Sequence, residues 1–139
     1  MFYITRRERF SAAHKLWNNQ LSESENNEIF DKCAYPNFHG HNYEFYVTVK
    51  GNINPKSGYV IDAKQLKKII HERIIDKTDH RNLNLDVDFL KDVNPTAENL
   101  LFYFWKELQP EIDNEHRKLF KLKLYETENN IAEYFGPEE

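Results

Sequence analysis

The chain has 139 residues, of which 40% are hydrophobic and 14% aromatic, enough for one ordinary core and too few for two comfortable domains. Its formal net charge is −4, and its 19 Lys and Arg residues are scattered among 23 acidic residues, so no cationic stripe indicates a nucleic-acid partner. Because no long apolar run is present and the lone cysteine cannot form an internal disulfide, we expect one cytoplasmic domain, residues 1–139, without nucleic-acid or membrane partners.

The first expected strand, residues 2–10, reads FYITRRERF and delivers the chain to His14. Its alternation is less clean than in the later strands. The apolar positions expected on one face are Phe2, Ile4 and Phe10. The stretch that follows, residues 18–31, is polar and aperiodic, which predicts a surface loop.

The second expected strand, residues 43–51, reads YEFYVTVKG and has the clearest alternation in the chain. One side consists of Tyr43, Phe45, Val47 and Val49, and the other of Glu44, Tyr46, Thr48 and Lys50. This period of two is typical of a half-buried strand. The strand carries two histidines, His39 and His41, at its entrance.

Two helices are expected next. The first covers residues 62–77, where Asp62 and Gln65 have the spacing of a capping box. Its stripe at helical spacing consists of Leu66, Ile69, Ile70 and Ile74. The second begins at Pro95 and ends at Pro110, because proline suits a first helical turn and also marks a helix end. Its apolar face consists of Leu100, Leu101, Phe104, Trp105 and Leu108.

The C-terminal part of the chain is expected to form a hairpin. Residues 119–127 read LFKLKLYET, and residues 131–135 can return beside them after Asn129 and Asn130. The alternation sets Phe120, Leu122 and Leu124 against Lys121, Lys123 and Tyr125. The expected fold is therefore α+β, with four antiparallel strands and two helices in the order strand, strand, helix, helix, strand, strand.

The histidines near the first two strands could hold a metal ion. Residues two apart on a strand project from the same face, so His39 and His41 can aim their imidazoles at one point. Catalytic zinc takes three protein ligands and keeps one position open, and His14 is the obvious third candidate. An H-x-H pair by itself is weakly specific, and loop histidines without a metal are the commoner outcome.

Five separated motifs decide between these alternatives: FSAAH, CAYPNFHGHNY, DHRNLNLD, NPTAENL and YETENN. Their order and approximate spacing, from Phe10 to Tyr134, resemble those of the family of 6-pyruvoyl-tetrahydropterin synthases and 6-carboxytetrahydropterin synthases. The resemblance implies that zinc is bound by His14, His39 and His41. It also implies the tunnelling fold, in which a four-stranded antiparallel sheet carries two helices on one face. In that fold the sheets join into a barrel by oligomerisation, usually as a homohexamer whose active sites are shared between subunits.

The resemblance also assigns proton-transfer residues. Cys33 resembles the family's catalytic cysteine, which acts as a base on the substrate side chain, and Asp79 with His80 resembles its acid–base partners. The alternative for Cys33 is a small buried residue, which is the commoner fate of a lone cysteine. An Asp-His dipeptide in a turn would by itself mean little.

Three further residues resemble the family's substrate-binding positions. Glu126 matches the glutamate that anchors the pterin, since a carboxylate can accept two parallel hydrogen bonds from the amino group and ring N–H of a 2-aminopterin. Thr96 and Glu98 match a Thr-x-Glu pattern that would support pterin recognition. Thr96 would equally suit a helix N-cap, and Glu98 an acidic residue in the first turn.

The implied activity is that of a zinc-dependent lyase that converts 7,8-dihydroneopterin triphosphate to a 6-substituted tetrahydropterin with loss of triphosphate. The spacer between Cys33 and His39, and LYETENN, resemble the pyruvoyl enzymes of tetrahydrobiopterin biosynthesis. NPTAEN and IAEY resemble the carboxy enzymes of queuosine biosynthesis, so the product is open. The alternative is a non-catalytic, zinc-stabilised oligomer that binds pterins; the presence of Cys33, Asp79 and His80 together argues against it.

Overall fold

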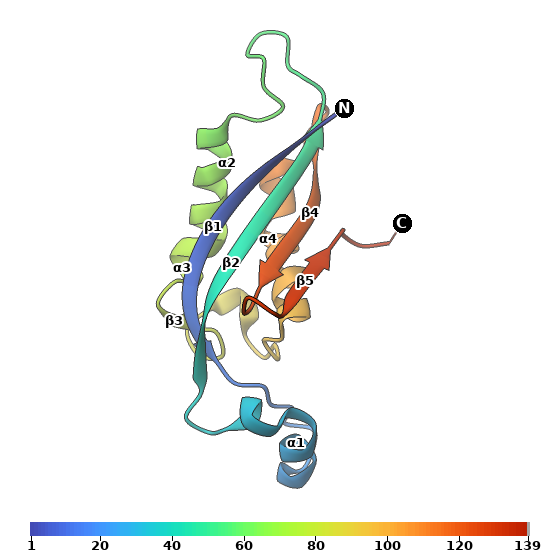
Figure 1. Ribbon diagram of the computed structural model, residues 1–139. Coiled ribbons are helices and arrows are strands. Elements are labelled where there is room, and N and C mark those ends of the chain that lie inside the picture. Colours follow the sequence, from blue (N-terminus) through green and yellow to red (C-terminus); the bar gives the residue numbers. More distant parts are fainter. Residues whose placement is uncertain (139) are drawn as a thin grey trace.

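The computed structural model describes residues 1–138 and contains a five-stranded mixed sheet (Figure 1). The strands are β1 (Phe2–His14), β2 (His39–Gly51), β3 (Arg81–Asn82), β4 (Arg117–Tyr125) and β5 (Ile131–Tyr134), in the order β3-β1-β2-β4-β5. The four long strands pair antiparallel, as predicted. The prediction of a four-stranded sheet is wrong, because two-residue β3 adds a parallel edge beside β1. A strand this short has no readable alternation.

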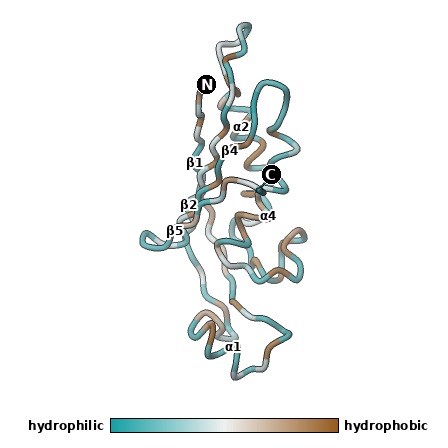
Figure 2. Tube along the Cα trace, turned by 90° about the vertical axis from the view of Figure 1, so that its right-hand side faces the viewer, coloured by the Kyte–Doolittle hydropathy of each residue, from teal (hydrophilic) through white to brown (hydrophobic). Residues whose placement is uncertain are grey.

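The helices that cover the sheet lie on one face, as Figure 2 shows from the side. They are α2 (Ala63–Ile70), continued by a π-helical turn (His71–Ile75) into α3 (Asp76–Thr78), and α4 (Ala97–Ile112). None of the helices in residues 1–138 is long and apolar enough to cross a membrane. Helix α2 begins after Asp62, whose carboxylate accepts a hydrogen bond from the backbone N–H of Lys64. The reciprocal contact expected from Gln65 is not part of this cap.

The core lies between these helices and the sheet. The β2 positions expected inside are all buried, namely Tyr43, Phe45, Val47 and Val49. The expected face of α4 is buried as well, namely Leu100, Leu101, Phe104, Trp105 and Leu108. Each such side chain stabilises the fold by about 1.5–3 kcal/mol through removal from water. The β1 prediction holds for Phe10, but Phe2, at the far end of the strand, is 49% exposed and lies outside the core.

Residues 18–31 do not form the expected surface loop, because Glu23–Phe30 is helix α1. The helix begins with a capping box in which Ser22 Oγ accepts from the Glu25 N–H at 3.1 Å and Glu25 Oε1 accepts from the Ser22 N–H at 3.2 Å. Asn26 is fully buried and bonds neighbouring backbone groups. Polar caps therefore stabilise α1, which has no apolar stripe at helical spacing to reveal it in the sequence.

The strand β4 contains one extra residue. Adjacent residues Thr48 and Val49 of β2 pair with Lys121 and Leu119, so Phe120 between them is a β-bulge. The predicted grouping of Phe120 on one face with Leu122 and Leu124 is therefore wrong, since Leu119 is buried with those two leucines and Phe120 is half-buried. A bulge shifts the alternation by one residue, which a strict period of two cannot anticipate.

The helix α4 has the expected length but begins and ends two residues later than expected. Thr96 is its N-cap, and the Thr96 hydroxyl accepts from the backbone N–H of Asn99 at 3.1 Å. The predicted end at Pro110 is wrong, because the helix runs to Ile112 and the Asp113 N–H still bonds the Gln109 carbonyl at 3.0 Å. The start of α4, the end of β1 and the start of β2 are brought together by contacts described next.

Candidate functional site

Three histidines from two strands meet on the helix-covered face of the sheet. His14, the last residue of β1, pairs directly with His39, the first residue of β2, and His41 lies two residues further on the same face. Their ligand nitrogens all lie within 4.8 Å of one another. The ring centroid of His14 is 4.6 Å from that of His39 and 5.0 Å from that of His41. The structure therefore brings together the histidines that the sequence singled out.

The hydrogen bonding of His14 fixes its tautomer. Nδ1 of His14 lies 2.8 Å from the carbonyl oxygen of Pro95, which can only accept, so Nδ1 carries the proton and Nε2 has a free lone pair. That Nε2 atom is buried and has no hydrogen-bond partner among the residues that the structure describes. A buried polar atom without a partner is rare and needs an explanation. A metal ion bound by Nε2 would provide one.

The electrostatics of the cluster favour the neutral form of His14 and His41. Burial lowers the pKa of His14 to about 4, against an opposing effect of its hydrogen bond to the Pro95 carbonyl. Burial also lowers the pKa of His41, while the nearby carboxylate of Glu126 acts in the opposite direction. Neutral imidazole is the form that coordinates metals. Three imidazoles without a fourth ligand in the group are the donor set of a catalytic zinc site with an open position.

The carboxylate of Glu126 lies between the histidines and a neighbouring cavity. Oε1 of Glu126 is 3.9 Å from Nε2 of His41. The cavity has a volume of about 450 Å³, within the range of small-molecule sites. Its walls include Thr96 and Glu98 from the start of α4, and Glu126 from the β4–β5 hairpin. The three residues expected to bind substrate therefore line one cavity, beside the histidine cluster.

Different hydrogen bonds fix the α4 wall of the cavity, at Thr96, and its hairpin wall, at Glu126. Thr96 serves as the helix cap described above, so its hydroxyl oxygen is already engaged by Asn99. Glu126 follows the last residue of β4, and its backbone N–H bonds the carbonyl of Asn130 across the hairpin at 3.0 Å. The cavity also has lining residues to which the motifs assigned no role in substrate binding, namely Leu16, Asn129, Ile131 and Ala132. These residues carry no chemical signature, and only the fold places them here.

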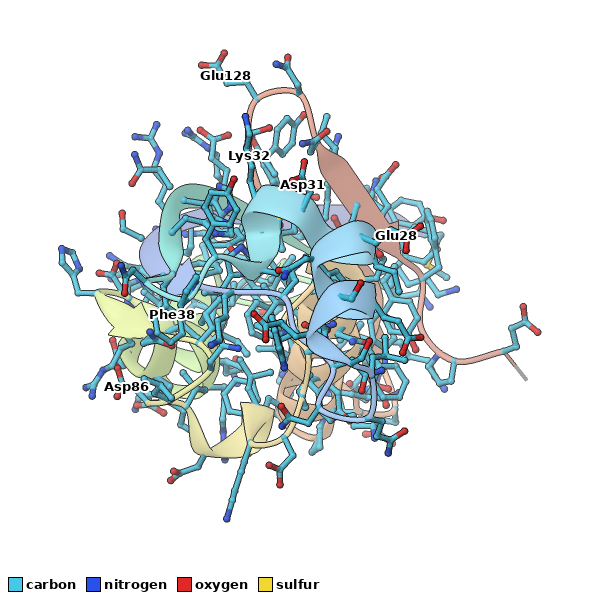
Figure 3. The ribbon with its side chains drawn as sticks, turned by 90° about the horizontal axis from the view of Figure 1, so that it is seen from below. Glu28, Asp31, Lys32, Phe38, Asp86 and Glu128 are labelled. Carbon is cyan, nitrogen blue, oxygen red and sulfur yellow. The ribbon has the colours of Figure 1, made fainter. Side chains whose placement is uncertain are left out.

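Cys33 lies in a 3-10 turn (Asp31–Ala34) between α1 and β2 and is half-buried. Seen from below, α1 and this turn lie across the end of the molecule, with Asp31 and Lys32 labelled (Figure 3). The carbonyl oxygen of Cys33 accepts from the Leu16 N–H at 2.7 Å. The turn that carries the thiol is thus tied to the chain two residues after His14.

Asp79 and His80 form the expected pair. Nδ1 of His80 lies 3.1 Å from Oδ1 of Asp79, and the same oxygen accepts from the Ser11 N–H at 2.9 Å. The Ser11 hydrogen bond is the main reason why the pKa of Asp79 is lowered. The side chain of His80 is 84% exposed, and its backbone has a positive φ of 60°. The pair is therefore presented to the outside at the β3 edge of the sheet.

This pair lies beside a different cavity from Glu126. The second cavity, of about 490 Å³, is lined by Ser11, Ala12, Ala13, Gly40, His41, Asn42, His80, Arg81 and Asn82. Ser11 and Asn42 alternate with the buried residues Phe10 and Tyr43, so this cavity opens on the sheet face that the helices leave uncovered. Within one chain, His80 thus lines a cavity that opens on the uncovered face, and His41 is the one member of the histidine cluster that also lines this cavity.

Comparisons with known proteins agree on one family. The profile of the 6-pyruvoyl tetrahydropterin synthase family matches residues 3–137. A 6-pyruvoyl tetrahydrobiopterin synthase of Pongo abelii is 46% identical over 133 residues, which are 96% of this chain and 90% of that protein. The solved structure of Caenorhabditis elegans 6-pyruvoyl tetrahydropterin synthase has a TM-score of 0.90 and 40% identity, covering 98% of this chain and 96% of that one. A 6-carboxy-5,6,7,8-tetrahydropterin synthase of Rickettsia typhi is 30% identical over 150 residues, 96% of this chain and 99% of that protein.

Proposed function

The chain belongs to the 6-pyruvoyl tetrahydropterin synthase family, and from this premise we propose that it is a zinc-dependent lyase. Its reaction converts 7,8-dihydroneopterin triphosphate to 6-pyruvoyl-tetrahydropterin and triphosphate. The observation that carries the proposal is the buried, unpartnered Nε2 of His14, which faces His39 and His41 beside the cavity that Glu126 lines.

The three imidazoles are assigned as the zinc ligands. Zinc favours nitrogen donors in tetrahedral sites, and three histidines leave one position for the substrate. When bound, zinc supplies Lewis-acid stabilisation to the oxygens of the substrate side chain and so makes the adjacent carbon-bound protons easier to remove. The chain keeps His14 neutral through burial and fixes its tautomer through the Pro95 carbonyl.

The pterin ring is assigned to the cavity of Thr96, Glu98 and Glu126. A carboxylate at Glu126 accepts two parallel hydrogen bonds from the amino group and ring N–H of the pterin, which orients the ring. The position of Glu126, 3.9 Å from His41, then directs the substituent of the ring toward the three histidines. Glu98 lies in the first turn of α4, lines the same cavity and is assigned a supporting contact to the ring.

Proton transfer is assigned to Cys33, with Asp79 and His80 as its partners. The 3.1 Å contact holds the His80 imidazole beside the Asp79 carboxylate, which orients it to give or take a proton. Because His80 lines a cavity that opens on the uncovered face of the sheet, the pair can serve the thiol of a neighbouring copy of the chain. A homo-oligomer, a hexamer by family resemblance, would bring the two together, and the cytoplasm is its proposed location.

The pyruvoyl product is favoured because the relatives of that name are 46% identical, against 30% for the carboxy enzyme. The balance of the reaction needs no external oxidant, since the ring gains the two hydrogens that the side chain loses as triphosphate leaves. The test is release of triphosphate from 7,8-dihydroneopterin triphosphate by the purified protein. Tight binding of the pterin without release would instead show a non-catalytic binding protein.

A further inference from the structure

Four consecutive backbone N–H groups directly after His14 are each bonded by a different part of the chain. The bonds are Lys15 N–H to Asn84 Oδ1 at 2.9 Å, Leu16 N–H to Cys33 O at 2.7 Å, Trp17 N–H to Asn94 Oδ1 at 3.2 Å and Asn18 N–H to Asn26 Oδ1 at 2.7 Å. Three of the four acceptors are asparagine side chains. The segment is not a strand or helix, so these contacts take the place of secondary structure in holding it.

Asn84 binds both backbone groups of Lys15. Its Oδ1 accepts from the Lys15 N–H, and its Nδ2 donates to the Lys15 carbonyl at 3.0 Å. Asn84 is itself fixed, because its own N–H bonds Oδ1 of Asn82 at 2.9 Å. Both residues belong to the DHRNLNLD motif, whose Asn residues have no role in the chemistry proposed above.

Asn94 holds the same segment from the other side. Its Oδ1 accepts from Trp17, while the carbonyl of the adjacent Pro95 accepts from Nδ1 of His14. Two neighbouring residues therefore bind positions three apart on the histidine-bearing segment. The carbonyl of Asn94 in turn accepts a hydrogen bond from Nδ2 of Asn99 at 2.9 Å, which anchors Asn94 to the first turn of α4. We call Asn84 and Asn94 together the clamp.

We propose that Asn84 and Asn94 are positioning residues of the active site. Their side chains fix the backbone from Lys15 to Trp17, and this segment sets the direction of the His14 imidazole and, through the Leu16 N–H, the place of the Cys33 turn. Leu16 also lines the cavity assigned to the pterin, so the clamp fixes one wall of that cavity. The effect on turnover rests on the proposed function, whereas the effects on metal affinity and thiol reactivity do not.

The two asparagines use their amides differently, which gives a sharp test. Asn94 uses only its oxygen toward the segment, so Asn94→Asp keeps an acceptor for Trp17, while Asn94→Ala removes it. Asn84 uses both oxygen and nitrogen, so Asn84→Asp places an acceptor against the Lys15 carbonyl and fails as surely as Asn84→Ala. A positioning role thus predicts rescue by aspartate at Asn94 and no rescue at Asn84.

Two readouts that need no turnover report the result. The first is the Zn²⁺ dissociation constant, measured by competition with a chromogenic chelator. The second is the rate at which iodoacetamide alkylates Cys33, the chain's one cysteine. We expect about a tenfold to hundredfold loss of zinc affinity in Asn94→Ala, Asn84→Ala and Asn84→Asp, as for other groups that orient metal ligands. The alkylation rate should change in the same three variants, and Asn94→Asp should match the wild type in both.

A control comes from the opposite end of the sheet. Asn114 Oδ1 accepts from the N–H groups of His116 and Arg117 at 2.8 and 3.0 Å, so Asn114→Ala loses similar bonds far from the histidines. It should lower thermal stability without changing either readout. Unchanged zinc affinity and alkylation rate in Asn84→Ala and Asn94→Ala, or equal losses in Asn114→Ala, would overturn the proposal. If Asn84→Ala does not fold, Asn94→Ala and Asn94→Asp decide the question. The proposal then requires that Asn94→Ala changes both zinc affinity and alkylation rate and that Asn94→Asp matches the wild type in both.

The outcome is separable from that of the proposed function. A wild-type protein that binds zinc but releases no triphosphate would refute the lyase. The zinc affinity and the Cys33 alkylation rate would still decide the role of the asparagines. Conversely, an active enzyme whose Asn94→Ala variant keeps wild-type zinc affinity, alkylation rate and turnover refutes the clamp alone.

Discussion

The carbonyl oxygen of Pro95 lies 2.8 Å from Nδ1 of His14 and so joins the start of α4 to the end of β1. The residue after Pro95 caps α4 and lines the cavity, and His14 belongs to the histidine cluster. One hydrogen bond therefore links the proposed metal ligand to the proposed substrate wall. A backbone acceptor cannot be lost by side-chain substitution, which leaves the neighbouring side chains as the testable partners.

The first prediction concerns metal content. Elemental analysis should find one zinc ion per subunit, and His14→Ala or His39→Ala should lose it, because two imidazoles are too few for a stable catalytic zinc site. His116, which is exposed and belongs to no motif, provides the control, and His116→Ala should keep full occupancy. Full zinc occupancy in both ligand variants would show that the assigned ligands are wrong.

The second prediction separates chemistry from binding at Cys33. Cys33→Ala should keep zinc and bind the pterin, yet lose about a hundredfold to ten-thousandfold in turnover, the usual contribution of a general acid–base group. Steady-state kinetics and zinc analysis on the same preparation measure both. Unchanged turnover would leave Cys33 as a packing residue.

The third prediction is that substitution of Glu126, unlike that of Cys33, weakens pterin binding first. Glu126→Gln replaces one acceptor oxygen by an amide donor and removes the charge, so we expect pterin affinity to fall by about tenfold to a hundredfold. Titration with the substrate under chelated, non-reacting conditions measures the affinity directly. A variant that binds as tightly as the wild type but turns over slowly would move Glu126 from ring recognition to the reaction itself.

The sequence predicted those parts of the fold where residue type and period coincide. The alternation of β2 and the apolar face of α4 were confirmed because burial on one face requires them. The period failed where local hydrogen bonds decide the structure, as in the capping box of α1 and the bulge at Phe120. Neither the helix nor the bulge depends on a long apolar stripe.

The sequence predicted the part of the candidate site that consists of metal-ligating and charged or polar side chains in recognisable motifs. The histidine cluster and the cavity residues Thr96, Glu98 and Glu126 were named from motifs, and the structure brings each set together. The Pro95 carbonyl and the wall residue Leu16 could not be named, because a backbone group or a leucine looks the same anywhere in a sequence. The placement of His80 in a second cavity also needed the three-dimensional sheet.

The fourth prediction follows from the pKa of Asp79, which the Ser11 N–H holds below its ordinary value of 3.8. A carboxyl group with a lower pKa in the folded state stabilises the fold above pH 3.8, and this contribution is lost as the pH falls through the folded-state value. Asp79→Asn should therefore reduce the dependence of stability on pH below about 4. Urea unfolding of the wild type and of Asp79→Asn at several values between about pH 3 and about pH 7 measures the free energy of unfolding as a function of pH. Two curves that run parallel over this range would contradict the prediction.

The fifth prediction concerns assembly. The sheet ends in β3 on one side and β5 on the other, and in the described chain neither has a partner on its outer edge. Unpaired strand edges favour association, and the proposed function assigns the Asp79–His80 pair to the thiol of a neighbouring copy. Light scattering should report an oligomer built on threes, with six subunits as the family resemblance implies. A monomer with full activity would contradict both the assembly and the shared site.

The most direct measurement is the product formed from 7,8-dihydroneopterin triphosphate by the zinc-loaded protein, identified by mass spectrometry alongside the amount of triphosphate released. The account predicts 6-pyruvoyl-tetrahydropterin and triphosphate in equal amounts, with both abolished by a chelator and restored by zinc. Formation of 6-carboxytetrahydropterin would contradict the assigned product. Substrate recovered intact from the zinc-loaded protein would contradict the lyase itself.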